Sequence, residues 1–129
     1  MTVFESRESL EEILIRLAEL VQTDPVFLEA SQGKTLTVSM ELPDWEVFFY
    51  TRFLDGQVEA GLEEPAETTI DLVMDSEIFD KVFTGALNPA KAAVKGDLAF
   101  SGNVAAAMRF QTLLSDFSRL YQQAKQEAS

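Results

Sequence analysis

The sequence predicts an α+β fold in which helices cover one face of a mostly antiparallel, five-stranded sheet, with a helix at each end of the chain. Two patterns support this prediction. Apolar residues recur at helical spacing near both ends of the chain, and they alternate with polar residues in its middle. The 129 residues contain no low-complexity linker and no internal repeat. We therefore expect one domain that covers residues 1–129.

The N-terminal part of the sequence predicts two helices. Residues 10–21 carry apolar side chains at helical spacing, with charged side chains on the opposite face. Ser9 is a candidate N-cap for this helix, and Ser6 is an alternative one turn earlier. Asp24 is followed directly by proline, which is the pattern of a second N-cap, so we expect residues 26–31 to form a short helix.

The middle of the sequence predicts four strands. Residues 35–42 alternate between apolar and polar side chains, as in a strand with one buried face. Residues 45–54 and 57–62 follow as two further strands, joined by Asp55-Gly56, a dipeptide typical of tight hairpin turns. Residues 68–74 form a separate strand after a Glu-Glu-Pro break. We expect a three-stranded antiparallel meander and one strand beyond it.

The C-terminal part predicts further helices around a fifth strand. Asp75 is a candidate cap for a helix that ends at Gly85, and Asn88-Pro89 has the pattern that begins a short helix. Residues 97–101 follow as the fifth strand. After Gly102-Asn103 the apolar spacing is helical nearly to the end, which predicts one long final helix.

The composition excludes most kinds of active site. The chain has no cysteine and no histidine, so it offers no thiolate nucleophile, no imidazole base and no metal site built from these ligands. Its many carboxylates do not follow the pattern of a calcium-binding loop. We therefore expect a protein that is not an enzyme, with no catalytic residue, no metal and no cofactor.

The charge is unevenly distributed along the chain, which has a formal net charge of −12. Residues 1–80 contain 4 basic and 19 acidic residues, whereas residues 81–129 contain 6 basic and 3 acidic ones. A strongly negative protein repels phosphates, so we expect no nucleic-acid partner. The basic C-terminal part is suited to a transient contact with an anionic membrane.

The N-terminus and the hydropathy pattern bear on location. The first residues have neither the basic region nor the apolar region of a signal peptide, and no apolar run has the length of a membrane span. We expect a cytoplasmic protein.

The apolar residues suggest a soft interior. The chain has 10 phenylalanines and 4 methionines, which fit either a packed core or a cavity that opens around an apolar ligand. The strand at residues 45–54 has large apolar or aromatic side chains on both faces. Phe48 and Tyr50 therefore need cover from a helix, a ligand or a partner subunit.

Residues 84–111 resemble the C-terminal signature of the sterol carrier protein 2 family. The matching features are a Gly-x-Leu-Asn-Pro turn at residues 85–89, a Gly-x-Leu strand at residues 96–98, a Gly-Asn turn at residues 102–103 and Met-Arg-Phe-Gln at residues 108–111, where the family has a step similar to Met-Lys-Leu-Gln. The resemblance extends more loosely over residues 35–114. Ala92-Ala93 stand where many members carry two aromatic residues, so the sequence does not fix the volume of the cavity.

The resemblance implies a five-stranded sheet with an apolar tunnel between sheet and helices. It implies non-enzymatic binding and transfer of a hydrophobic lipid: a fatty acyl chain, an acyl-CoA ester, an isoprenoid or a sterol-like molecule. The residues expected along the tunnel are Phe79, Phe83, Val94, Phe100, Met108, Gln111 and Leu114. Lys95 and Arg109 are expected head-group contacts.

The family resemblance also allows a second function. Some domains of this kind are accessory modules that dimerise or act as scaffolds for biosynthetic enzymes. In that case the core would be filled, no ligand would bind, and Phe48 and Tyr50 would form a homodimer patch.

Overall fold

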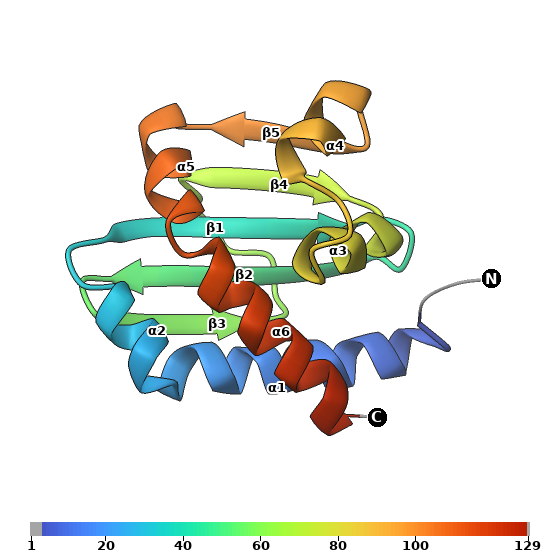
Figure 1. Ribbon diagram of the computed structural model, residues 1–129, viewed down its shortest axis with the longest axis horizontal. Coiled ribbons are helices and arrows are strands. Elements are labelled where there is room, and N and C mark those ends of the chain that lie inside the picture. Colours follow the sequence, from blue (N-terminus) through green and yellow to red (C-terminus); the bar gives the residue numbers. More distant parts are fainter. Residues whose placement is uncertain (1–3, 129) are drawn as a thin grey trace.

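The computed structural model describes residues 4–128 (Figure 1). The elements follow in the order α1 (Arg7–Thr23), α2 (Pro25–Ala30), β1 (Thr35–Leu42), β2 (Val47–Leu54), β3 (Gln57–Gly61), β4 (Ile70–Met74), α3 (Ser76–Phe83), α4 (Pro89–Lys95), β5 (Leu98–Gly102), α5 (Val104–Gln111) and α6 (Leu114–Ala128). The predicted α+β class is confirmed, with helices α1 and α6 toward the two ends of the chain.

The five strands form one sheet in the order β3-β2-β1-β4-β5. The β1–β2, β2–β3 and β4–β5 pairs are antiparallel, whereas β1 and β4 are parallel. The sheet is therefore mostly antiparallel, as predicted. At the β2–β3 turn, Asp55 and Gly56 have φ angles of 49° and 89°, which is the pair of positive angles that a tight hairpin turn requires.

Helices α3, α4, α5 and α6 lie over one face of the sheet, and α1 runs along the β3 edge and packs against α6 (Figure 1). The apolar residues of β1 are all buried in the core: Leu36, Val38, Met40 and Leu42. Aromatic side chains from α3 and α6 complete it. Phe83 and Phe117 have ring centroids 4.8 Å apart, and Phe79 meets Tyr121 edge-on at 5.0 Å. Each fully buried aromatic side chain of this kind contributes about 2–3 kcal/mol.

The prediction of one long C-terminal helix is wrong, because the chain bends between α5 and α6. The amides of Thr112 and Leu113 donate to the carbonyls three residues earlier, at 3.3 and 2.9 Å, which tightens the last turn of α5. The hydroxyl of Thr112 also donates to the carbonyl of Arg109, at 2.7 Å. The bend places α5 over β4 and β5, while α6 crosses the rest of the sheet (Figure 1).

The structure also shows where α1 and β2 begin. Helix α1 begins one turn earlier than the Ser9 cap would allow, because the hydroxyl of Ser6 accepts the amide of Ser9 at 3.1 Å. Strand β2 begins at Val47 and not at Trp45, because Glu46 has a φ of 54° and belongs to the turn. Within residues 4–128, no helix combines the length and hydropathy that a membrane crossing needs.

Candidate functional site

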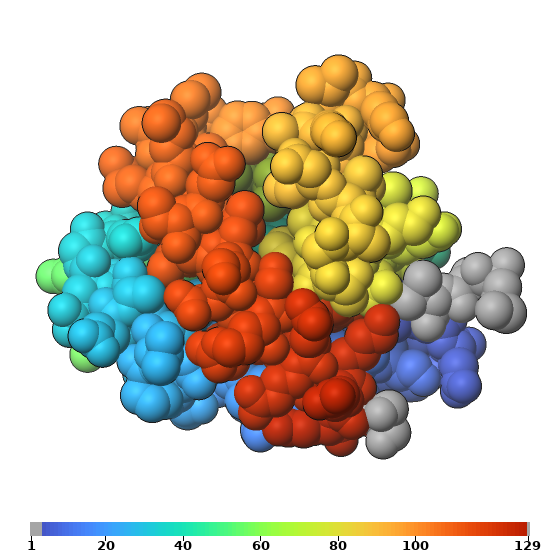
Figure 2. Space-filling view, in the orientation of Figure 1, coloured from blue at the N-terminus to red at the C-terminus, as the bar shows by residue number. Residues whose placement is uncertain are grey.

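An apolar pocket opens between the β4–β5 edge of the sheet and the helices above it. Its volume is about 280 Å³, close to the lower end of the range of small-molecule sites. Figure 2 shows the hollow between α5 on one side and the α3–α4 region on the other. The lining residues are Ile70, Leu72, Met74, Val82, Phe83, Pro89, Ala90, Ala93, Leu98, Phe100, Val104, Ala107, Met108, Phe110, Gln111 and Leu114.

Two capped helices at the ends of β5 form the walls of this pocket. The side-chain oxygen of Asn88 accepts the amides of Ala90 and Lys91 at 2.8 and 3.2 Å, so α4 starts where the sequence predicts. Asn103 caps α5 in the same way, by accepting the amide of Ala106 at 2.9 Å. These two caps fix α4 and α5 on either side of the opening.

The pocket has a buried floor and an exposed rim. The floor includes Ile70, Met74 and Phe83, which are 2% exposed or less. The rim includes Phe100, Val104 and Met108, which are 40%, 67% and 64% exposed. Among the lining residues, Gln111 alone has a polar side chain. A lining of this kind can bind an apolar group by burying it, but it supplies no acid, base or nucleophile.

A smaller recess of about 130 Å³ lies next to the pocket, on the side of α6. It shares Val82, Phe83, Pro89 and Leu114 with the pocket, and it adds the hydroxyls of Ser115 and Ser118. The two serines also line a wide polar groove along α6, of about 1060 Å³. From the pocket through the recess to the groove, the lining residues therefore change from apolar to polar.

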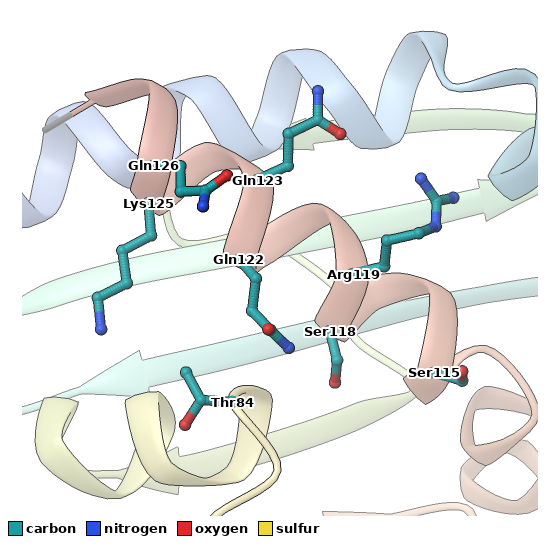
Figure 3. Close-up of a pocket in the computed structure, with 8 residues that line it drawn as sticks. All are labelled: Thr84, Ser115, Ser118, Arg119, Gln122, Gln123, Lys125 and Gln126. Atoms are coloured by element: carbon teal, nitrogen blue, oxygen red, sulfur yellow. The ribbon is translucent and has the colours of Figure 1, made fainter.

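The polar groove is drawn in Figure 3. Its lining residues are Thr84, Ser115, Ser118, Arg119, Gln122, Gln123, Lys125 and Gln126. Gln122 and Ser118 point across the groove toward Thr84, whereas Arg119 and Gln123 point away from it (Figure 3). Although the groove is larger than the apolar pocket, it is shallow and polar, so it cannot enclose an apolar ligand.

Both basic side chains of the groove are already neutralised. Arg119 lies 2.8 Å from the carboxylate of Asp24, and Lys125 lies 2.6 Å from that of Asp80. The hydrogen bond from Arg119 holds the pKa of Asp24 below its usual value, and Asp24 in turn raises the pKa of Arg119. These charges join helices to one another, and they leave the groove without a free cation for an anionic ligand.

The structure brings five of the seven expected tunnel residues together in the pocket lining: Phe83, Phe100, Met108, Gln111 and Leu114. Phe79 is fully buried in the core beneath, where it packs against Phe83. Val94 is 88% exposed and lies on the outer side of α4, in a shallow recess with Lys91 and Lys95. Gln111 is exposed at the pocket rim, so its amide is open to solvent.

Sequence reasoning missed 11 of the 16 lining residues, among them three residues of β4 and one aromatic residue of α5: Ile70, Leu72, Met74 and Phe110. Ile70, Leu72 and Met74 recur at a spacing of two in the sequence, which could have identified them as one face of β4. The two expected head-group contacts lie outside the lining of the pocket: Lys95 on α4 and Arg109 on α5.

The described part of the chain contains no cluster of three or more acidic side chains that could hold a metal ion.

Comparisons with known proteins identify the family. The sequence profile of the SCP-2 sterol transfer family matches residues 15–115. The sterol carrier protein domain 2 of Helicoverpa armigera is similar in structure, with a TM-score of 0.67 and 17% identity over 86% of this chain and 89% of that domain. A conserved hypothetical protein of Thermus thermophilus has a TM-score of 0.65 and 17% identity over 96% of this chain and 90% of that protein.

The fold also occurs as part of a much larger enzyme. The sec-alkylsulfatase Pisa1 of Pseudomonas sp. has a TM-score of 0.59 and 14% identity over 81% of this chain, which spans only 15% of that enzyme. The search of curated proteins found no match. At these identities the structural likeness establishes the fold.

Proposed function

The chain belongs to the SCP-2 sterol transfer family, and from this membership and the apolar pocket we propose that it binds and transfers a hydrophobic lipid without catalysing a reaction. The observation that carries the proposal is the lining of the pocket between β4–β5 and the helices, in which Gln111 is the one polar side chain. We propose residues 1–129 as a single lipid-binding domain. The cytoplasmic location expected from the sequence stays a prediction.

Burial of the lipid chain supplies the driving force. Each methylene group that leaves water gains about 0.8 kcal/mol, less the cost of ordering the ligand and the protein. Of the expected site residues, Phe83 and Leu114 form the inner wall, and Phe100, Met108 and Gln111 form the rim. A fatty acyl chain, an acyl-CoA ester, an isoprenoid or a sterol-like molecule fits this chemistry.

The recess next to the pocket gives the ligand a direction in which to extend. Because the recess shares Phe83 and Leu114 with the pocket, a modest movement of these two side chains would join the two spaces. The ligand would then lie in a tunnel that ends at the hydroxyls of Ser115 and Ser118. Such a tunnel would match the one that the family resemblance implies.

Binding of a fluorescent fatty acid to the lipid-free protein tests the proposal. Ala107 lines the pocket and Ala105, two residues earlier on α5, does not, so tryptophan at either position gives a matched pair. We expect Ala107→Trp to weaken binding at least tenfold, because the indole fills the cavity, and Ala105→Trp to bind like the wild type. Folded wild-type protein that binds no lipid probe would overturn the proposal.

The alternative function is a homodimeric interaction module. It has less support, because Phe48 and Tyr50 are each already half-buried within one chain. A dimer that binds no lipid probe, and that dissociates when Tyr50 is replaced by aspartate, would favour this alternative.

A further inference from the structure

The β5 edge of the molecule, with α4 and α5 beside it (Figure 1), carries several exposed apolar side chains, here called the apolar rim. Phe100, Val104 and Met108 line the pocket opening, and Val94 lies on the outer side of α4. Val94 is 88% exposed, which is the largest value among the exposed large apolar side chains of the described residues. The remaining exposed ones are scattered over α1, α2 and β2. Apolar side chains gathered in this way are typical of a surface that another apolar phase covers.

Basic side chains without an ion pair lie beside the apolar rim. Six of the ten basic residues pair with a carboxylate within 4.0 Å. Among residues 4–128, the basic residues that make no such pair are Lys34, Lys91, Lys95 and Arg109. Three of these four are on α4 and α5: Lys91 and Lys95 flank Val94, and Arg109 follows Met108.

The local charge contrasts with that of the whole chain. Residues 86–113 contain three basic residues and one acidic residue, which gives a net charge of +2 in a protein of −12. The acidic helix α1 lies at the opposite edge of the sheet from β5, α4 and α5 (Figure 1). A negatively charged surface would therefore attract the β5 edge, with α4 and α5, and repel the opposite edge.

We propose that the apolar rim, with Lys91, Lys95 and Arg109, docks the protein on an anionic lipid bilayer with the pocket mouth against the bilayer. The basic side chains pair with lipid phosphates while Val94, Val104 and Met108 enter the interface between head groups and acyl chains. Docking in this orientation would let the ligand pass directly between the bilayer and the pocket, and this consequence rests on the proposed lipid-binding function. The docking itself does not depend on it.

Sedimentation with vesicles tests the docking. The full chain is mixed with vesicles of phosphatidylcholine alone and with vesicles of phosphatidylcholine and phosphatidylglycerol. We expect binding to the second kind only, and weaker binding as the salt concentration rises, because salt screens the attraction. Equal binding to both kinds of vesicle, or no binding to either, would overturn the proposal.

Two matched pairs of variants locate the docking surface. Lys91→Gln with Lys95→Gln removes two charges next to Val94 on α4, and Lys34→Gln with Arg52→Gln removes two elsewhere. We expect the first pair to lower vesicle binding about 25-fold, at about fivefold for each charge, and the second to lower it much less. Val94→Gln should weaken binding several-fold, and Val26→Gln, at another exposed valine, should not. Equal losses within either comparison would overturn the assignment to this surface.

Lipid binding in the absence of vesicles separates this proposal from the proposed function. Lys91, Lys95 and Val94 do not line the pocket, so their variants should bind a fluorescent fatty acid as the wild type does. A wild-type protein that binds the fatty acid but not anionic vesicles contradicts the docking alone. A protein that binds the vesicles but not the fatty acid contradicts the proposed function alone.

Discussion

Asp80 on α3 accepts a hydrogen bond of 2.7 Å from the hydroxyl of Tyr121 on α6. The same carboxylate oxygen accepts a second one, of 2.6 Å, from Nζ of Lys125. Burial is the main cause that raises the pKa of Tyr121 well above its usual value, and the hydrogen bond to Asp80 is the second. The hydroxyl therefore remains a donor. The contact joins α3 to α6 next to Phe83, which lines the pocket.

This contact predicts how two substitutions change stability. Tyr121→Phe should lower the free energy of unfolding by about 1–2 kcal/mol, because Asp80 loses one of its two donors. Asp80→Ala should lower it by about 2–3 kcal/mol, because it leaves a buried hydroxyl unpaired and an ammonium without its partner. Urea unfolding followed by the fluorescence of Trp45 measures both. Unchanged stability in Tyr121→Phe would show that the hydrogen bond contributes nothing.

A second prediction concerns the loss of stability at acidic pH. Asp24 caps α2 by accepting the amide of Phe27 at 2.9 Å, and it also pairs with Arg119 on α6 at 2.8 Å. Because its pKa is lower in the folded protein than in the unfolded chain, the stabilisation is complete above the unfolded value of about 3.9 and is lost as the pH falls through the folded value.

Comparison of Asp24→Asn with the wild type isolates this effect. Asparagine keeps the cap but loses the charge, so we expect the variant to be less stable at neutral pH by about 1 kcal/mol. The difference should begin to shrink as the pH falls below about 4, where Asp24 of the unfolded chain becomes protonated, and it should be lost once the pH is below the lower pKa of the folded protein. Urea unfolding across this pH range measures it. A difference that stays constant down to pH values well below the folded pKa would rule out the ionic contribution.

Local chemistry explains which elements could be predicted from the sequence. Apolar and polar residues alternate along the whole of β1, and Asn88 caps its helix as expected, because these signals need only neighbouring residues. The bend at Thr112 was not predictable, because residues 104–128 contain neither glycine nor proline and keep their helical spacing. On either side of the bend, Phe110 and Phe117 pack against Phe53 and Phe49 of β2, which are contacts between residues far apart in the sequence.

The pocket shows the same limit. Phe83, Met108 and Leu114 were identified through the family resemblance, and they meet in the pocket. The position of Val94 depends on the rotation of α4, a helix of seven residues that buries Ala92. Such a short helix has too few residues for the sequence to indicate which face turns inward. Long-range packing, not local preference, decides it.

A third prediction tests the junction between β5 and α5. Gly102 has a φ of 123°, and a Cβ added there would lie 2.3 Å from the carbonyl oxygen of Thr69. Gly102→Ala should therefore move the start of α5 and lower the free energy of unfolding by about 2 kcal/mol or more. Gly85→Ala is the control, because Gly85 also has a positive φ but an added Cβ would meet nothing within 4 Å. Similar losses in the two variants would mean that backbone strain alone, without the clash, sets the cost.

The last prediction concerns the head group of the ligand. Gln111 is the polar residue of the pocket lining and is exposed at its rim, so its amide can bind a carboxyl or hydroxyl group of the ligand. Gln111→Leu should weaken binding of a fatty acid by about 1 kcal/mol, or about fivefold, through the lost hydrogen bond. Binding of a hydrocarbon of equal length should not weaken. Displacement of a fluorescent probe by each ligand measures the difference.

Two controls complete this prediction. Met108→Trp should weaken binding of both the fatty acid and the hydrocarbon, because it narrows the pocket mouth without changing its polarity. Gln32→Leu makes the same chemical change at an exposed glutamine outside the pocket and should affect neither ligand. If Gln111→Leu weakened both ligands equally at unchanged thermal stability, the amide would act through the shape of the rim and would not anchor the head group.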